Sequence, residues 1–376
     1  MKIGLVCPYN IFRGGGVQEC VLALQEGIIK RGHEAYIITP RPNDHNGDHK
    51  DGVILVGRAR PVRAAQTSAQ ISVNVEPDKL DQLLEEEKFD LLHFHEPWIP
   101  ILSMQILSRS DAIHVATFHA AMSERRTSRT VEKVITPYTK SIFKYIDVLT
   151  AVSPTATNYV GSLTRRPIEI VSNGIDLKKY HETNNHHLDP KLKKLLYVGR
   201  LEKRKGVRYL LDALKLLSEN DKTYKLAIAG DGPDREKLEQ YVKKESIKNV
   251  KFLGYIDEKT KLKLLGESDI FCSPALYGES FGIVLLEAMA TGCVAIAGNN
   301  SGYDSVMSGR GQISLVNPKD TLEFARRIKL LATDEVIRKA WKEWARDHVK
   351  TYDYDKVIDD YVDVYEKAYE QKHKKT

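Results

Sequence analysis

The chain has 376 residues, of which 42% are hydrophobic and 29% charged, with a formal net charge of +6. At roughly 150 residues per domain this length predicts two domains, and the composition excludes an intrinsically disordered or fibrous chain. The longest apolar stretch, residues 281–298, contains Glu287 and Gly292 and therefore lacks the ~20 uninterrupted apolar residues of a membrane span.

The first half of the chain alternates short β-branched runs with segments of helical periodicity, which is typical of βαβ units around a parallel sheet. We expect strands at Lys2–Cys7, Glu34–Thr39, Val53–Val56, Asp90–His95, His114–Phe118, Val148–Ala151 and Glu169–Val171. We expect helices at Val17–Lys30, Pro77–Glu87, Val131–Tyr145 and Pro154–Ser162. The N-terminus shows no signal-peptide pattern, so the sequence predicts a cytoplasmic protein.

The second half restarts the same pattern. Its expected strands are Lys194–Val198, Lys225–Ala229, Val250–Leu253, Asp269–Cys272 and Val294–Ala297. The polar stretch Tyr180–Pro190 has no apolar period and is expected to connect the two halves. We therefore expect two doubly wound α/β domains, residues 1–176 and 177–353, and a last helix over Tyr354–Tyr369 that packs back on the first domain.

The chain has four cysteines, which show neither paired spacing nor density: Cys7, Cys20, Cys272 and Cys293. A reduced cysteine in an apolar run behaves as a small hydrophobic residue, so we interpret them as core and not as ligands. We find no D-x-D pair beside a strand end that would indicate a metal site. The positive charge favours an anionic ligand or membrane surface. The sequence lacks the basic stripe with interspersed aromatic residues that would indicate a nucleic-acid partner.

Two glycine-containing loops precede predicted helices. Gly14-Gly15-Gly16 follows the first strand, where the backbone and a helix N-terminus could approach a phosphate, although a simple tight turn is an equal alternative. In the second half, residues 199–206 carry Arg200 and Lys205 at the carboxyl end of a strand, where open α/β sheets bind ligands. These cations could neutralise a diphosphate, or the segment could be a solvated basic loop.

Two glutamates eight residues apart favour a binding site. Glu287 lies in an otherwise apolar predicted helix, and a buried carboxylate requires a polar partner. Glu279 lies just before that helix, so the two carboxylates would be up to ~12 Å apart if the segment were helical throughout, a separation that suits two ends of an extended ligand. The N–H groups of residues 280–283 could face a phosphate between them. The alternative is a capping carboxylate together with a glutamate tied to the backbone.

The segment from Glu279 to Glu287 resembles the E-x7-E motif of the retaining family four glycosyltransferases, which have the GT-B fold. Similar motifs extend along nearly the whole chain: residues 14–18, 90–97, 116–119, 172–176, 199–200, 205–206, 229–233 and 278–282. Within that family, residues 6–9, 15–18, 95–97 and 282–285 most resemble the phosphatidylinositol mannosyltransferases. The resemblance implies two Rossmann-like domains facing a central cleft, the first for the acceptor and the second for the nucleotide-sugar donor.

The resemblance also implies roles for individual residues. Arg200 and Lys205 would hold the donor diphosphate, Glu287 the ribose hydroxyls and Glu279 the hydroxyls of the transferred sugar. The implied catalytic set is His119, Arg200, Lys205 and Glu279. The implied donor-binding set is Gly15, Gly16, Asn173, Gly199, Arg200, Lys205, Gly230, Ser280, Phe281, Gly282, Ile283 and Glu287. His119 would contact the sugar, although a lone histidine is more often structural, and Tyr9 and Asn10 are acceptor contacts by position.

Two features depart from the mannosyltransferase pattern, and both concern the acceptor. Residues 76–87 are rich in Asp and Glu where that group has a basic amphipathic helix for anionic lipid, and Glu124 takes the place of a lysine after the catalytic histidine. Arg125 and Arg126 follow directly. Arg58, Arg60 and Arg63 could face an anionic head group or simply be solvated.

The sequence thus predicts a retaining, metal-independent hexosyltransferase without a cofactor. Its favoured reaction moves mannose from GDP-mannose to a lipid or lipid-linked acceptor, and UDP-linked glucose, galactose or N-acetylglucosamine and a diacylglycerol, polysaccharide or soluble acceptor remain alternatives. A sugar-nucleotide epimerase, a phosphorylase and an inactive binding protein are less favoured. We expect a monomer without a nucleic-acid partner, with peripheral association at the inner membrane face.

Overall fold

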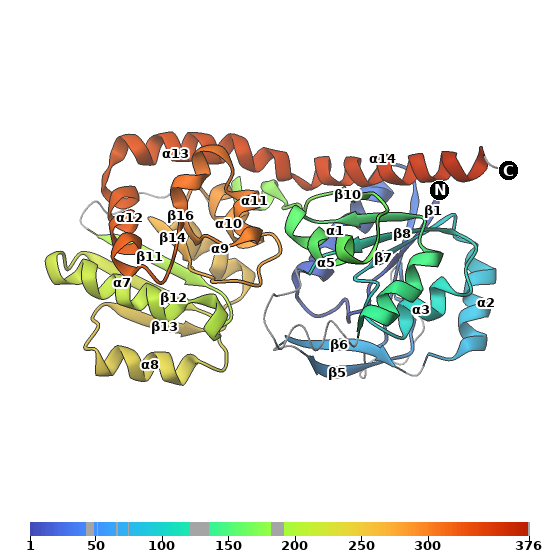
Figure 1. The fold of residues 1–376 in the computed structure, drawn as a ribbon, viewed down its shortest axis with the longest axis horizontal. Coiled ribbons are helices and arrows are strands. Elements are labelled where there is room, and N and C mark those ends of the chain that lie inside the picture. Colours follow the sequence, from blue (N-terminus) through green and yellow to red (C-terminus); the bar gives the residue numbers. More distant parts are fainter. Residues whose placement is uncertain are drawn as a thin grey trace. The chain divides into compact units, whose positions relative to one another are not determined.

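The protein is described from a computed structural model that covers residues 1–42, 49–50, 52–64, 67–73, 75–120, 135–181 and 192–374. The chain divides into two compact units, and Figure 1 labels many of their helices and strands. Unit 1 comprises Met1–Gly174 and Tyr354–Thr376, and unit 2 comprises Ile175–Asp353. Among the described residues, no helix combines the length and the apolarity that a membrane crossing needs.

Unit 1 is built on an eight-stranded sheet in the order β10-β9-β8-β7-β1-β2-β4-β3. The strands are β1 (Lys2–Val6), β2 (Glu34–Pro40), β3 (His49–Lys50), β4 (Val53–Val56), β7 (Leu91–His95), β8 (Ile113–Phe118), β9 (Val148–Ala151) and β10 (Ile168–Ile170). Every neighbouring pair is parallel except β3 with β4. Both β7 and β8 are buried along their whole length, as expected for the centre of a parallel sheet.

Helices lie between these strands in the sequence: α1 (Gly16–Lys30), α2 (Pro77–Glu87), α3 (Leu102–Leu107) and α5 (Pro154–Leu163), with the 3₁₀ turn η1 (Phe143–Tyr145). Residues 135–142 are also helical, whereas the first residues of the helix expected from Val131 lie outside the described part. The C-terminal helix α14 (Tyr354–His373) belongs to unit 1. Its buried residues Val357, Ile358, Tyr361, Val364, Tyr365 and Ala368 repeat every three or four positions and join the core formed by β1, β2 and α1.

Unit 2 has a six-stranded, wholly parallel sheet in the order β13-β12-β11-β14-β15-β16. Its strands are β11 (Lys193–Val198), β12 (Tyr224–Ala229), β13 (Val250–Gly254), β14 (Ile270–Ser273), β15 (Val294–Gly298) and β16 (Leu315–Val316). The accompanying helices are α6 (Leu177–His181), α7 (Val207–Asn220), α8 (Arg235–Lys244), α9 (Glu258–Gly266), α10 (Ile283–Ala290), α11 (Ser301–Val306), α12 (Thr321–Thr333) and α13 (Glu335–His348). The 3₁₀ turns are η2 (Lys203–Lys205), η3 (Gly309–Ser314) and η4 (Val349–Tyr352).

Two segments illustrate how the structure differs from the sequence prediction. The residues after Val56 form an antiparallel hairpin of β5 (Arg58–Ala64) and β6 (Thr67–Val73). The expected polar connection from Tyr180 begins instead inside α6, because Tyr180 is 5% exposed and packs into the core of unit 2. Asn184, Asn185, His186 and His187 of that connection lie outside the described residues.

Candidate functional site

The loop after β11 displays its basic residues in different environments. Arg200 is exposed, and its carbonyl oxygen accepts a 2.9 Å hydrogen bond from the Tyr197 hydroxyl. Arg204 and Lys205 lie in η2 and are only partly exposed. The loop therefore leaves the Arg200 guanidinium in solvent and turns the next cations toward the protein.

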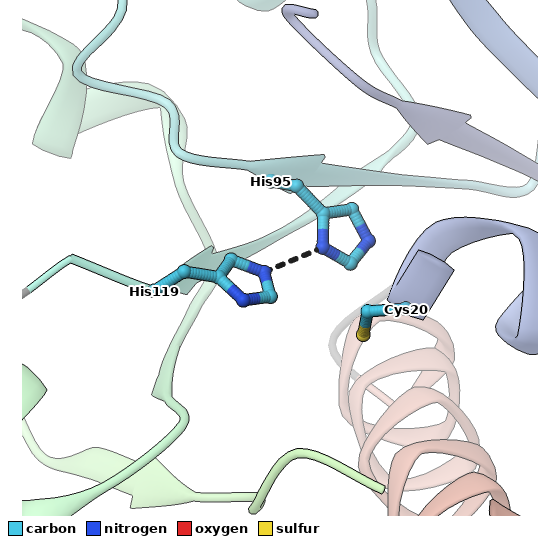
Figure 2. A group of neighbouring side chains, drawn as sticks. All are labelled: Cys20, His95 and His119. Atoms are coloured by element: carbon cyan, nitrogen blue, oxygen red, sulfur yellow. Dashed lines mark hydrogen bonds between the residues drawn. The ribbon is translucent and has the colours of Figure 1, made fainter. Parts of the chain in front are cut away.

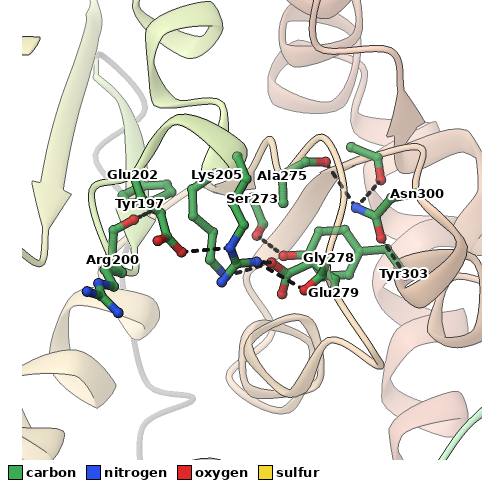
Figure 3. Close-up of polar contacts among 12 residues, drawn as sticks. Tyr197, Arg200, Glu202, Lys205, Ser273, Ala275, Gly278, Glu279, Asn300 and Tyr303 are labelled. Atoms are coloured by element: carbon green, nitrogen blue, oxygen red, sulfur yellow. Dashed lines mark hydrogen bonds and ion pairs between the residues drawn. The ribbon is translucent and has the colours of Figure 1, made fainter. Parts of the chain in front are cut away.

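Glu279 forms ion pairs with both Arg204 and Lys205 (Figure 3). Its Oε1 lies 2.7 Å from Nη1 of Arg204 and 2.8 Å from Nζ of Lys205. Arg204 also pairs through Nε with Glu202 at 2.7 Å, and the Glu202 side chain is 4% exposed. Two carboxylates thus balance Arg204 and Lys205, and exposed Arg200 adds a further positive charge to the same loop.

Close backbone approaches bring these loops together. Gly206, at φ 71°, ends η2, and a Cβ there would lie 2.0 Å from the carbonyl oxygen of Pro274. Gly302 of α11 approaches Glu279 in the same way, with 2.0 Å between an added Cβ and the Glu279 carbonyl oxygen. Asn300 caps α11 and donates through Nδ2 to the carbonyl of Ala275 at 3.0 Å. The loops after β11, β14 and β15 are thus held in contact at the carboxyl ends of their strands.

Glu287 has a lysine as its partner. It is the fifth residue of α10 and is 5% exposed, and its Oε1 lies 2.8 Å from Nζ of Lys261 on α9. Lys261 also contacts Glu258 at 2.9 Å. The polar group that the sequence required beside Glu287 is therefore a cation on a neighbouring helix.

The remaining predicted donor residues of unit 2 lie in loops after the strands and at the start of α10. Gly199 (φ 157°) and Gly230 (φ 126°) follow neighbouring strands, and an added Cβ on Gly230 would lie 2.0 Å from the Gly199 carbonyl oxygen. Gly282, at φ 122°, is the N-cap of α10, which begins at Ile283. Ser280 lies in the preceding loop, and Phe281 is buried, with its ring centroid 5.5 Å from that of Tyr352. The first-turn N–H groups of α10 are the donors that could face an anion.

In unit 1, His119 directly follows β8 and is 7% exposed. Its Nε2 shares a 2.9 Å hydrogen bond with Nδ1 of His95, the last residue of β7. Burial lowers the pKa of His119 to about 4, and a hydrogen bond with the Asn173 side chain acts in the opposite direction. Burial also lowers the pKa of His95. Both imidazoles are therefore neutral near pH 7, so each has one N–H donor and one acceptor nitrogen.

Glu96 anchors the backbone beside this histidine pair. It has φ 51°, is 1% exposed, and accepts a 2.7 Å hydrogen bond from the backbone N–H of His119. Trp98 donates through Nε1 to the other oxygen of the same carboxylate. Burial raises the pKa of Glu96 to about 7, while the hydrogen bonds from His119, Ala120 and Trp98 lower it. This carboxyl group positions the loop that carries His119.

The glycine loop of unit 1 caps the first helix. Gly15 is the N-cap of α1, which begins at Gly16, and no atom lies within 4 Å of a Cβ built on Gly14. Tyr9 is partly exposed, and its carbonyl oxygen accepts a 2.6 Å hydrogen bond from Thr39. Asn10 is 5% exposed and accepts from the backbone N–H of Phe12 at 3.1 Å. These residues follow β1, which neighbours β7 in the sheet.

The structure thus gathers the predicted residues into two sets, one in each unit. In unit 2, Lys205 and Glu279 are in direct contact, while the ion pairs of Glu279 are with Arg204 and Lys205 and not with Arg200. In unit 1, His119 and Asn173 are in contact. Sequence reasoning missed Glu202, Arg204, Lys261 and His95. The signal for Arg204 was the uninterrupted Lys203-Arg204-Lys205 run, and that for His95 was its position at the end of a strand two residues after His93.

Comparison with known proteins identifies both units. Residues 14–179 match the model of Glycosyltransferase Family 4, and residues 179–348 match that of Glycosyl transferases group 1. A phosphatidyl-myo-inositol mannosyltransferase of Mycolicibacterium smegmatis is 32% identical, over 97% of this chain and 94% of its own. One from Propionibacterium freudenreichii is 32% identical, over 82% of this chain and 80% of its own.

The fold is also that of solved glycosyltransferases. The structure of sucrose-phosphate synthase from Thermosynechococcus elongatus superposes with a TM-score of 0.78, covering 98% of this chain and 99% of that chain at 18% identity. This confirms the predicted pair of doubly wound α/β domains of the GT-B fold. The family matches and the two curated relatives confirm the resemblance read from the motifs: the chain belongs to the group 1 glycosyltransferases of family 4.

Proposed function

We propose that the protein is a retaining mannosyltransferase that moves mannose from GDP-mannose to the inositol head group of a membrane phospholipid. The observation that carries this proposal is the 32% identity, over nearly the full length of both chains, to a protein named as a phosphatidyl-myo-inositol mannosyltransferase. The intact charged cluster of unit 2 supports it, because a glycosyltransferase must stabilise a departing nucleotide diphosphate.

The donor diphosphate is proposed to bind at the loop after β11. Arg200 is exposed and available to a ligand, whereas Lys205 and Arg204 hold Glu279 at 2.8 and 2.7 Å. A diphosphate placed beside Lys205 would share that cation with Glu279, so the carboxylate and the phosphates would be fixed relative to one another. Cations that are already positioned stabilise charge as it develops on a leaving group, with little reorganisation.

The sugar and the ribose are proposed to contact the two glutamates of α10 and its preceding loop. Glu279 would accept hydrogen bonds from hydroxyls of mannose, and Glu287 from the ribose. Both carboxylates are already paired with lysines at 2.8 Å, so binding the hydroxyls does not leave either charge without a partner. Gly282 and Ile283 would supply backbone N–H groups to the phosphates from the first turn of α10.

His119 is proposed to contact the transferred sugar as a neutral hydrogen-bonding group. Its pKa of about 4 keeps the imidazole uncharged under ordinary conditions. We propose a front-face mechanism, in which the departing phosphate takes the proton of the acceptor hydroxyl while Arg200 and Lys205 stabilise the developing charge. Because these cations occupy the place of a metal ion, the proposed reaction needs neither a metal nor a cofactor.

The acceptor is proposed to come from a membrane surface, with Tyr9 and Asn10 as contacts. Helix α2 does not offer an anionic lipid a basic face, since its exposed residues include Asp78, Asp81, Glu85 and Glu86. Arg58 and Arg60 on β5 are exposed and are the alternative contacts for lipid phosphate, whereas nothing is described for the side chain of Arg63. Glu124, Arg125 and Arg126 lie outside the described residues.

The test is nucleotide release from GDP-mannose and from UDP-glucose, UDP-galactose and UDP-N-acetylglucosamine, each with vesicles containing phosphatidylinositol, diacylglycerol or polyprenyl phosphate. We expect release from GDP-mannose, stimulated by phosphatidylinositol. Glu279→Gln should lower turnover by about 10²–10³-fold, the scale of losing one positioned transition-state contact. Glu239→Gln, an exposed carboxylate on α8 in the same unit, is the matched control and should keep wild-type turnover.

The panel separates the parts of the proposal. Preference for a UDP-sugar would refute the GDP-mannose donor, and stimulation only by another lipid would refute the phosphatidylinositol acceptor. Wild-type turnover in Glu279→Gln would remove Glu279 from the mechanism. The protein should co-sediment with vesicles of anionic lipid at low salt. If the same fraction of protein co-sediments with neutral vesicles, the proposed association with an anionic membrane is refuted.

A further inference from the structure

Three side chains with metal-binding atoms meet inside unit 1: Cys20 of α1, His95 at the end of β7 and His119 after β8 (Figure 2). One donor atom from each lies within 4.8 Å of the other two. All three residues are buried, at 4%, 0% and 7% exposure. The sequence prediction treated Cys20 as core, and its burial agrees with that, but its neighbours are two imidazoles.

One nitrogen of the cluster lacks a hydrogen-bond partner. Nε2 of His95 is buried and makes no hydrogen bond within the described part of the chain, whereas Nδ1 of the same ring is bonded to His119. The neighbouring His93 differs, since its Nδ1 contacts the Tyr365 hydroxyl and its Nε2 contacts Thr117, each at 2.6 Å. A buried polar atom without a partner is unfavourable, so the hydrogen bonds of the described residues do not fully satisfy the His95 ring.

The spacing fits one small cation. Zn–N bonds of about 2.0 Å and Zn–S bonds of about 2.3 Å place tetrahedral donors roughly 3.3–3.7 Å apart. The two histidine nitrogens are 2.9 Å apart, so they need to separate by only a few tenths of an ångström. The third donor lies within 4.8 Å and would need to approach by about 1 Å.

The donor set selects the kind of cation. Burial raises the pKa of the Cys20 thiol to about 12, so the cation would displace the thiol proton, which is released to solvent, and bind the sulfur as thiolate. One thiolate and two imidazoles suit zinc and related borderline metals, whereas Mg²⁺ and Ca²⁺ prefer oxygen ligands. Three protein donors leave a fourth tetrahedral position for water. We infer that Cys20, His95 and His119 form a binding site for a single zinc-class cation within unit 1.

Occupation of this site has a consequence for activity, and this step rests on the proposed function. The cation would take a lone pair of the His119 imidazole, which is the group proposed to contact the transferred sugar. It would also replace the hydrogen bond between His119 and His95 with two metal bonds. Zinc therefore acts as an inhibitor of transfer, and a chelator reverses the inhibition.

Binding is tested without any measurement of activity. The full chain, stripped of metal, is dialysed against zinc and its metal content measured beside Cys20→Ala and Cys293→Ala. Cys293 is the matched control, a 2% exposed thiol in unit 2. We expect about one zinc per chain in the wild type and Cys293→Ala, and at least tenfold weaker binding in Cys20→Ala. Absence of bound zinc in the wild type, or wild-type affinity in Cys20→Ala, overturns the inference.

A spectroscopic measurement on the wild type keeps the test valid if Cys20→Ala fails to fold. X-ray absorption at the zinc edge should show one sulfur and two imidazole nitrogens around the metal, and a shell of oxygens alone overturns the inference. In the transfer assay, zinc should inhibit the wild type and Cys293→Ala at least tenfold more strongly than Cys20→Ala. Stoichiometric binding without inhibition keeps the site and refutes the proposed role of His119.

Discussion

Lys261 neutralises a carboxylate that the fold has largely removed from water, and its replacement measures how far that pairing stabilises unit 2. Its Nζ lies 2.8 Å from Oε1 of Glu287, and the two side chains are 15% and 7% exposed. Lys261→Met keeps the apolar stem and removes the charge. Removing one partner of a buried pair costs about 3–5 kcal/mol. We expect the lower end, about 3 kcal/mol, because Lys261 retains some exposure.

The assay is urea unfolding followed by tryptophan fluorescence. Two of the three tryptophans, Trp341 and Trp344, lie in unit 2, so the signal reports mainly on that unit. Lys263→Met is the matched control on the same helix, since Lys263 pairs with Glu267 at 3.9 Å with side chains 70% and 39% exposed. An exposed pair contributes about 0–1 kcal/mol, so this variant should unfold close to the wild type.

Equal unfolding free energies for the two lysine variants would refute the argument that burial makes the Glu287 pair different. Combining Lys261→Met with Glu287→Gln supplies a further check. The cost of the single change arises mainly from an uncompensated buried charge, so removing that charge should recover part of the lost stability. A double variant that is less stable than Lys261→Met alone would contradict this account.

Two further changes test the backbone approach and the C-terminal helix. Gly206→Ala should lower the free energy of unfolding by at least about 2 kcal/mol, because it combines a positive φ with a Cβ 2.0 Å from the Pro274 carbonyl oxygen. Gly309→Ala is the comparison, because φ there is 58° but the atom nearest to an added Cβ is 3.9 Å away. Equal losses of unfolding free energy for the two variants in urea would contradict the predicted effect of the clash at Gly206. Tyr365→Phe should cost about 1–3 kcal/mol, because it removes the partner of buried His93 Nδ1. Thermal unfolding followed by near-ultraviolet circular dichroism measures this cost. Tyr255→Phe is the control, because Tyr255 is 87% exposed, and equal stability of the two variants would contradict the predicted role of the Tyr365 hydroxyl.

The repeating βα pattern made most of the fold predictable. The central strands are short, mostly apolar runs, and the structure places β7 at Leu91–His95 and β14 at Ile270–Ser273, within one residue of the expected bounds. The hairpin of β5 and β6 was missed because Arg58, Arg60 and Arg63 alternate with small residues and Pro61 rather than with large apolar ones. The pairing of such strands depends on register and turn geometry, which hydrophobic periodicity does not report.

The sequence indicated some residues of the candidate site but not the pairs that they form. Burial of Glu287 in an apolar helix demanded a polar partner, and this follows from the sequence alone. That the partner is Lys261, 26 residues earlier, depends on how α9 packs beside α10. In the same way the Lys203-Arg204-Lys205 run offered three cations, and only the turn of η2 determines that the last two face Glu279 while Lys203 is exposed.

Each of the two glutamates of the motif is paired with a lysine, and Glu287 is buried more deeply than Glu279. Glu279 and Glu287 have side chains 13% and 7% exposed, and each lies 2.8 Å from a lysine ammonium. Apolar side chains of similar size would give equal or greater stability than a buried ion pair. Stability alone therefore does not account for two such pairs in one short segment. The proposed ligand binding would account for them, because a carboxylate held by a lysine keeps acceptor lone pairs for sugar hydroxyls while its charge stays compensated.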